Sequence, residues 1–180
     1  MADYITTYTG LHFYPLQPTE EGIRIEDIAH ALSLICRGNG HVKHFFSVGQ
    51  HCINCTLEAI ARGYSDRVCL ACLLHDASEA YLSDVPRPFK KSQPEYQRIE
   101  DKVIAVIYKK FLKEELTAEE LRQVKEIDDD MLYYDLKELL NEVLEGAAPV
   151  LKHDISQELM PFEEVERKYL ELYMALSSII

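Results

Sequence analysis

The stretch Cys72-Leu73-Leu74-His75-Asp76-Ala77-Ser78-Glu79-Ala80-Tyr81-Leu82 places three residues that can bind a metal or move a proton inside an apolar, helix-forming segment. A buried helix face should not carry an unpaired carboxylate, because removing such an ion from water without a partner is strongly unfavourable. A divalent metal beside the imidazole of His75 would supply the missing positive charge. The pair His75-Asp76 therefore predicts a site whose other ligands come from elsewhere in the chain.

The chain on both sides of this stretch predicts an all-α bundle of about six helices. Apolar residues recur at helical spacing in several segments. Gly63 follows one of them as a natural C′ residue, and Thr117 with Glu120 forms a capping box that opens another. The expected helices cover about residues 25–35, 47–62, 65–85, 95–111, 117–146 and 162–176. The first 24 residues predict a short extended or hairpin-like segment.

Length and composition favour a single domain of 180 residues, with an extended segment at 1–24, a core at 25–145, and a connector and last helix at 146–180. The net charge of −12 argues against a protein that binds a nucleic-acid duplex, which needs a basic face. No apolar run is long enough for a membrane span, and Met1-Ala2-Asp3-Tyr4 does not begin like a signal peptide. We therefore expect a cytoplasmic protein that does not bind membranes.

Two cysteine pairs, Cys52-x-x-Cys55 and Cys69-x-x-Cys72, have a spacing close to that of a zinc ribbon. Zinc knuckles usually turn tightly beside their cysteines, whereas the inserts Ile53-Asn54 and Leu70-Ala71 continue a helical pattern. A redox role is disfavoured because no βαβ pattern surrounds either pair. We interpret the four cysteines as small apolar residues on buried helix faces.

A second carboxylate is expected on the inward face of the segment 117–146. On a helical projection Asp128 falls inside the apolar stripe, whereas Asp129 and Asp130 point away from it. The stripe consists of Leu121, Val124, Leu132, Leu136, Leu139 and Val143. Asp135 lies about 20° from Asp128 on the same projection and is the rival candidate. A buried Arg or Lys partner would be the alternative explanation for either carboxylate.

His51 is the remaining candidate ligand, one turn from Val48 and from Cys55 on the expected buried side of the segment 47–62. A single inward histidine is usually a packed core residue, but here three segments each offer a metal-binding group. The combined set is His51, His75, Asp76 and Asp128. Two imidazoles and two carboxylates suit a divalent ion such as Mn²⁺, Co²⁺, Fe²⁺, Zn²⁺ or Mg²⁺.

The order His…His-Asp…Asp resembles that of the HD-domain metal-dependent phosphohydrolases. The run HDASEAYLSDVPRP at 75–88, with VGQH at 48–51 and VKEID at 124–128, is similar to one branch of that superfamily. This branch includes bacterial 5′-deoxynucleotidases and phage deoxynucleoside triphosphohydrolases. The resemblance covers residues 25 to about 140 and implies an HD-domain helical bundle, with metal ligation by the four residues named above.

The same resemblance implies roles for residues around the metal. It implies a catalytic carboxylate at Glu79 and an acidic residue near the substrate at Asp84. Either could orient the attacking water or protonate the leaving alkoxide. Arg37 matches a phosphate-contacting arginine of the family. Arg87, held between two prolines, is a further candidate to neutralise a phosphate, whereas Lys90 is interpreted as a solvated surface residue.

The sequence thus favours a divalent-metal-dependent phosphohydrolase that releases phosphate from deoxynucleoside monophosphates. A single ion is expected, because no histidine between His75 and His153 could supply the second metal site found in some HD enzymes. The enzyme alternative is a deoxynucleoside triphosphate triphosphohydrolase. The non-enzyme alternative is a metal-containing nucleotide-binding module without turnover. The expected partner is a small-molecule nucleotide, and the last amphipathic segment also permits a homo-oligomer.

Overall fold

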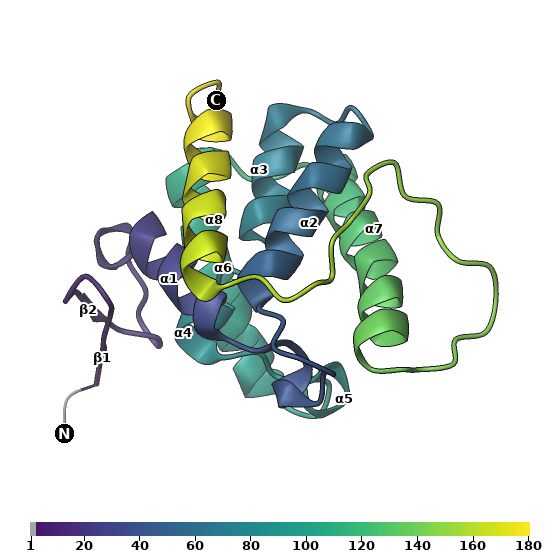
Figure 1. Ribbon diagram of the computed structural model, residues 1–180. Coiled ribbons are helices and arrows are strands. Elements are labelled where there is room, and N and C mark those ends of the chain that lie inside the picture. The colour runs from purple at the N-terminus through teal and green to yellow at the C-terminus, as the bar shows by residue number, and fades with distance from the viewer. Residues whose placement is uncertain (1–2) are drawn as a thin grey trace.

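The computed structural model describes residues 3–180 and is mostly helical, which confirms the predicted all-α class (Figure 1). The six longer helices are α1 (Ile25–Leu34), α2 (Val48–Ala61), α3 (Asp66–Leu74), α6 (Pro94–Leu112), α7 (Ala118–Tyr134) and α8 (Phe162–Ser177). The short helices are α4 (Glu79–Leu82) and α5 (Arg87–Lys90), with 3₁₀ turns at Glu20–Gly22 and Arg37–Gly40 and a π-helical turn at Asp135–Leu139. Strands β1 (Ile5–Thr6) and β2 (His12–Phe13) pair antiparallel, as the N-terminal prediction required.

Helix α3 lies at the centre of the bundle because its sequence is apolar on every side. All residues from Val68 to Leu74 are buried. Helices α2, α6, α7 and α8 pack against it, and α1 packs on α2 and α8 (Figure 1). The pair His75-Asp76 follows directly from the most deeply buried helix. Within residues 3–180, no helix is both long enough and apolar enough to cross a bilayer.

The prediction of one continuous helix over 65–85 was wrong. Helix α3 ends at Leu74, and His75 begins a tight turn that leads into α4. Within this turn the amide of Ala77 donates to the carbonyl of Leu74 at 2.9 Å, and that of Glu79 donates to Asp76 at 3.0 Å. Asp and Ser favour such turns because their short polar side chains compete with helical backbone bonds. The turn places His75 and Asp76 close to His51 on α2 and Asp128 on α7.

The prediction of a helix up to Gly146 was also wrong. Helix α7 ends at Tyr134, the π-helical turn follows, and Asn141 adopts a positive φ of 56°. The expected apolar stripe fails at both ends, because Leu121 is 49% exposed and Val143 is 94% exposed. The buried row of this segment is instead Val124, Ile127, Met131, Asp135 and Leu139.

The non-helical segment 141–161 is held by a polar face of α2. Gln50 Nε2 donates to the carbonyl of Glu158 at 2.9 Å, and Asn54 Nδ2 donates to that of Ser156 at 3.0 Å. The buried carboxylate of Glu58 accepts from the backbone amide of Lys152 at 2.9 Å, as well as from the next amide and from Arg62. These bonds compensate for the burial of a charge. They also fix the segment that leads into α8.

Candidate metal centre

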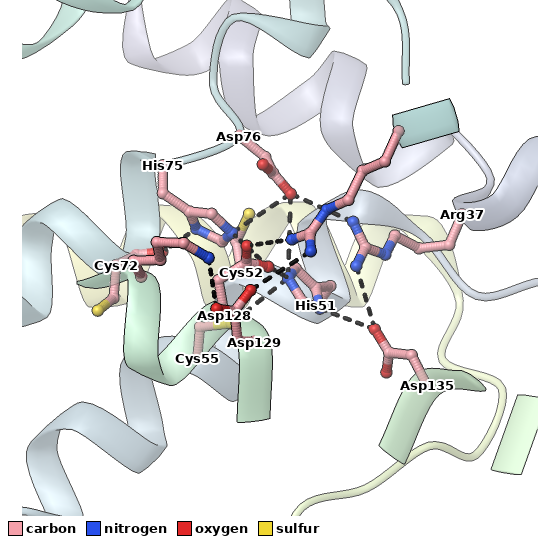
Figure 2. A network of polar contacts seen from close by, with 12 residues as sticks. Arg37, His51, Cys52, Cys55, Cys72, His75, Asp76, Asp128, Asp129 and Asp135 are labelled. Carbon is pink, nitrogen blue, oxygen red and sulfur yellow. Dashed lines mark hydrogen bonds and ion pairs between the residues drawn. The ribbon is translucent and has the colours of Figure 1, made fainter. Parts of the chain in front are cut away.

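The four predicted ligands come from three parts of the fold and converge (Figure 2). His51 lies on α2, His75 and Asp76 lie in the turn after α3, and Asp128 lies on α7. Nε2 of His51 is 3.3 Å from Oδ1 of Asp128 and 3.9 Å from Oδ2 of Asp76. Nε2 of His75 is 3.6 Å and 3.3 Å from the same two oxygens. Ligands that share an ion with bonds of about 2.1 Å stand roughly 3.0–3.4 Å apart, so this group could hold a metal.

The hydrogen bonds made by Nδ1 of both imidazoles leave Nε2 as the nitrogen that faces the carboxylates. Nδ1 of His51 is 2.9 Å from a carboxylate oxygen of Asp135, and Nδ1 of His75 is 2.7 Å from the carbonyl of Cys72. Both partners are acceptors, so each Nδ1 carries the proton and donates. Among the described residues, Nε2 of His75 is buried without a hydrogen-bond partner. The two Nε2 atoms therefore face two carboxylates, an arrangement that could hold a cation.

The same carboxylates control the proton affinity of the cluster. Burial acts to lower the pKa of His51, but negative groups that include Asp135 and Asp128 outweigh it and raise that pKa well above its ordinary value. Burial likewise opposes protonation of His75, and Asp76 and Asp128 raise its pKa well above the ordinary value. Burial acts to raise the pKa of Asp128, yet the two imidazoles lower it. Without a metal the cluster thus attracts protons, which a metal must displace.

Asp135, the rival ligand, lies behind His51 rather than among the four converging groups. Its Oδ2 accepts from Nδ1 of His51 and from Nη2 of Arg37, at 2.9 and 3.2 Å. Arg37 also donates from Nη1 to Asp76 at 3.2 Å, so it joins two carboxylates of the centre. The geometry favours Asp128 as the ligand and Asp135 as the group that orients His51. Arg37, expected to contact phosphate, binds carboxylates here.

Glu79 and Asp84, the two predicted catalytic acids, both line the cavity beside the cluster. Glu79 is 5% exposed, and its Oε2 has no hydrogen-bond partner among the described residues. Burial, followed by the charges of Asp76 and Asp84, raises the pKa of Glu79 well above its ordinary value. These surroundings favour the neutral acid form of its carboxyl group. Asp84 accepts a bond from the amide of Gly38 at 3.3 Å, which ties its loop to the turn at Arg37–Gly40.

The cavity has a volume of about 420 Å³, in the range of small-molecule sites. Its charged lining residues are Arg37, Asp76, Glu79, Asp84, Arg87, Lys90, Asp128 and Asp135. Its apolar lining residues are Val42, Val85, Pro86, Pro88, Leu132, Leu136, Leu139 and Leu140. The cavity thus offers both an ionic and an apolar surface to one molecule.

Arg87, the other predicted phosphate contact, lies at the cavity on the short helix α5. Its Nη2 donates to Oδ2 of Asp128 at 2.7 Å, and Nη1 donates to Asp129 at 3.3 Å. This bond uses the outer oxygen of Asp128 and leaves Oδ1 facing the imidazoles. The side chain of Arg87 is half exposed, so it can change partners without unfolding the site. Lys90 also lines the cavity and pairs with Glu100 at 2.7 Å.

The chain is similar to two uncharacterized bacterial proteins. It is 42% identical over 108 residues to YfdR of Escherichia coli (strain K12), a match that covers 60% of this chain and 58% of the relative. It is 37% identical over 102 residues to RCAP_rcc00048 of Rhodobacter capsulatus, covering 53% of this chain and 52% of the relative. The chain thus matches little more than half the length of each relative. No family model matches it.

Sequence reasoning missed a thiol at this centre. The four cysteines of the two CxxC motifs are buried and form no disulfide, as expected. The two on α2, Cys52 and Cys55, lie against the metal-binding groups (Figure 2). Sγ of Cys55 is 3.5 Å from Nε2 of His51. Cys52 approaches His75 and Asp76, with its ligand atom and theirs within 4.8 Å of one another. The i, i+4 spacing of His51 and Cys55 was the available signal, because it places both on one helix face.

Proposed function

We propose that this protein is a mononuclear, divalent-metal-dependent phosphohydrolase that acts on nucleotides, with deoxynucleoside monophosphates as the substrate class. The observation that carries the proposal is the convergence of two imidazole Nε2 atoms and two carboxylates beside a buried carboxylic acid. The resemblance of this chain to the HD-domain phosphohydrolases supports the same function. The ligands would be His51, His75, Asp76 and Asp128.

The nature of the donor atoms supports one divalent ion. Nitrogen and oxygen ligands in this mixture suit Mn²⁺, Co²⁺, Fe²⁺, Zn²⁺ or Mg²⁺. Such an ion, when bound, lowers the pKa of bound water and polarises a phosphoryl oxygen. Asp135 would hold the imidazole of His51 in the tautomer that presents Nε2 to the ion.

Glu79 is the group we assign to proton transfer. Burial and two neighbouring carboxylates raise its pKa and so favour its protonated form. Its Oε2 makes no competing hydrogen bond among the described residues, so the proton can pass to a leaving alkoxide. Asp84 would support this role in two ways, by its negative charge near Glu79 and by its bond to the amide of Gly38.

The cavity lining supports a phosphate ester that carries an apolar group. Arg87 can move from Asp128 to a phosphate oxygen, and Arg37 places a second positive charge at the cavity. The leucines of the π-helical turn and of the end of α7 offer an apolar surface for a base or sugar. A volume of about 420 Å³ accommodates a molecule of nucleotide size.

The test is release of inorganic phosphate from a panel of deoxynucleoside monophosphates with Mn²⁺, Co²⁺, Zn²⁺ or Mg²⁺. We expect EDTA and Asp76→Ala to abolish release. Glu79→Gln should retain the metal but lower kcat by about 10²–10⁴. Glu119→Ala is the matched control, because Glu119 lies on the same helix, α7, and its exposed carboxylate pairs with Arg122 rather than with a residue of the cavity.

Product analysis by chromatography separates the alternatives. Inorganic triphosphate from deoxynucleoside triphosphates, with no phosphate from monophosphates, would replace the proposed substrate. Nucleotide binding without any product under all four metals would replace catalysis by a binding function. Phosphate release that persists in both EDTA and Asp76→Ala would refute the proposal.

A further inference from the structure

The cysteines of α2 are not used by the proposed hydrolase, yet one of them touches its centre. Cys55 is 1% exposed, and its Sγ lies 3.5 Å from Nε2 of His51 (Figure 2). The hydrogen bond between Nδ1 of His51 and Asp135 leaves Nε2 directed at Sγ of Cys55, so the two atoms can share a proton or bind one ion. The ligand atoms of His51, Cys55 and His75 all lie within 4.8 Å of one another.

The spacing matches that of mixed nitrogen and sulfur ligands around one ion. Bonds of about 2.0–2.1 Å to nitrogen and 2.3 Å to sulfur in a tetrahedral site separate these ligands by roughly 3.6 Å. The observed distance between Sγ of Cys55 and Nε2 of His51 is 3.5 Å. Nε2 of His75, buried and without a hydrogen-bond partner among the described residues, provides the third donor.

Ordinary core packing is the alternative explanation, and Cys69 illustrates it. Its Sγ donates to the carbonyl of Tyr64 at 3.7 Å and belongs to none of the metal-binding groups found among the described residues. Cys55 differs because its neighbours are two imidazole nitrogens. Replacing its shared proton with a cation would leave the arrangement of donors unchanged.

We propose that His51, Cys55 and His75 form a second, sulfur-containing binding mode for a thiophilic ion such as Zn²⁺ or Cd²⁺. The ion displaces to solvent the thiol proton and any proton on the two Nε2 atoms, and the thiolate of Cys55 becomes its ligand together with the two imidazoles. Thiolates select soft ions, whereas carboxylates favour hard ones. The inference rests on the proposed function in one respect: an ion bound in this mode occupies both imidazoles, so it excludes the hydrolytic ion and inhibits the enzyme.

The second thiol offers a competing set, in which Cys52 would join His75 and Asp76. We favour Cys55 because its set contains two imidazoles, and because Cys55 directly contacts one of them. Asp128 does not belong to the sulfur-containing set. The two sets therefore predict different sensitivities to substitution.

The test is titration of the metal-free chain of residues 1–180 with Cd²⁺, monitored by the thiolate-to-cadmium charge-transfer band in the ultraviolet. All variants carry Cys36→Ser, because Cys36 is the cysteine that is not fully buried. We expect the band in the parent protein, in Asp128→Asn and in Cys69→Ser, which is the matched buried-thiol control. Cys55→Ser should lose the band and bind Cd²⁺ at least about tenfold more weakly. Cys55→Ala is the second variant, for use if the serine hydroxyl prevents folding.

A band that persists in folded Cys55→Ser or Cys55→Ala would overturn the inference. A band lost in Cys52→Ser but kept in the Cys55 variants would assign the thiol to the competing set and also overturn it. The outcome is independent of the hydrolase test. A charge-transfer band in a protein without phosphatase activity supports the sulfur-containing binding mode and refutes the proposed function. Mn²⁺-dependent phosphatase activity in a protein without the band supports the function and refutes the sulfur-containing mode.

Discussion

The proposed metal ligands are held in place by hydrogen bonds to residues that do not bind the ion themselves. His51 is completely buried, and its orientation depends on the bond from Nδ1 to Asp135. Asp135 in turn shares Oδ2 with Arg37, which also binds Asp76. A charged partner on Nδ1 makes an imidazole a stronger ligand and fixes its tautomer. Asp135 should therefore contribute to metal affinity without touching the metal.

Asp135→Asn tests this role. The amide keeps the shape of the side chain but removes the charge, so we expect affinity for Mn²⁺ to fall by about 10–100-fold. Isothermal titration calorimetry measures the change, and Asp129→Asn is the control with the same loss of charge on a nearby exposed residue. Unchanged affinity in Asp135→Asn would show that His51 does not depend on this bond.

The sequence identified the residues that converge but not all of their contacts. Asp76 and Asp128 stand out because each is a carboxylate in an apolar segment. The roles of Asp128 and Asp135 could not be separated, since the two lie on almost the same side of a regular helix. They are separated in space by which atoms face them: Nε2 of His51 faces Asp128, and Nδ1 faces Asp135.

Individual elements were predictable where local signals mark their ends. Helix α2 begins after Ser47, whose side chain accepts from the amide of Gln50, and the capping box of Thr117 and Glu120 opens α7 as expected. The break after Leu74 and the end of α7 at Tyr134 carry no Gly or Pro, so hydrophobic periodicity continued through both. The Asp and Ser residues after Leu74 are a weaker signal than Gly or Pro, and the site is built on these two boundaries.

Gly49 shows how closely the elements around α2 approach one another. A Cβ atom at this position would lie 2.9 Å from Cγ1 of Val165 on α8 and 3.2 Å from the backbone of Leu32 on α1. Ala at a helical position normally stabilises by up to about 1 kcal/mol relative to Gly. Overpacking costs about 1–3 kcal/mol, and backbone atoms of α1 cannot rotate away as a side chain can.

We therefore expect Gly49→Ala to destabilise the protein despite its higher helix propensity. Denaturant unfolding of Gly49→Ala, Val165→Ala and the double variant separates the two contacts. The double variant should be less destabilised than the sum of the two single variants, because shortening Val165 relieves its contact with the methyl group added at position 49. The relief should be partial, because the contact with the backbone of Leu32 remains. A Gly49→Ala protein as stable as the parent would contradict this prediction, because it would mean that α1 and α8 can shift to accommodate the added methyl group without loss of stability.

The whole molecule combines a strongly acidic chain with a buried cluster that attracts positive charge. The net charge is −12. The carboxylates that lie at the centre raise the pKa of two buried imidazoles. A group whose pKa is higher in the folded state stabilises the fold below its unfolded pKa, which for histidine is about 6.5. That contribution is lost as the pH rises through the folded pKa. Glu79, whose pKa is also raised, acts in the same direction.

These shifts predict how the stability of the whole protein depends on pH and metal. Asp128 and Asp135 have lowered pKa values, so their contributions are lost only in acid and do not change above neutrality. In EDTA, Tm should therefore fall as the pH rises from 6 to 9. Each tenfold difference in proton affinity corresponds to about 1.4 kcal/mol, and about 1 kcal/mol moves Tm by roughly 2–4 °C in a chain of this size.

With saturating Mn²⁺ or Zn²⁺ the pH dependence should reverse or flatten, because fewer protons compete for the imidazoles as the pH rises. The increase in Tm caused by the metal should thus grow between pH 6 and 9, as measured by thermal unfolding at a series of pH values. Asp128→Asn should show a smaller slope in EDTA, since it removes a carboxylate that faces both imidazoles. A metal-free Tm that rises over this range would contradict the protonated state inferred for the centre.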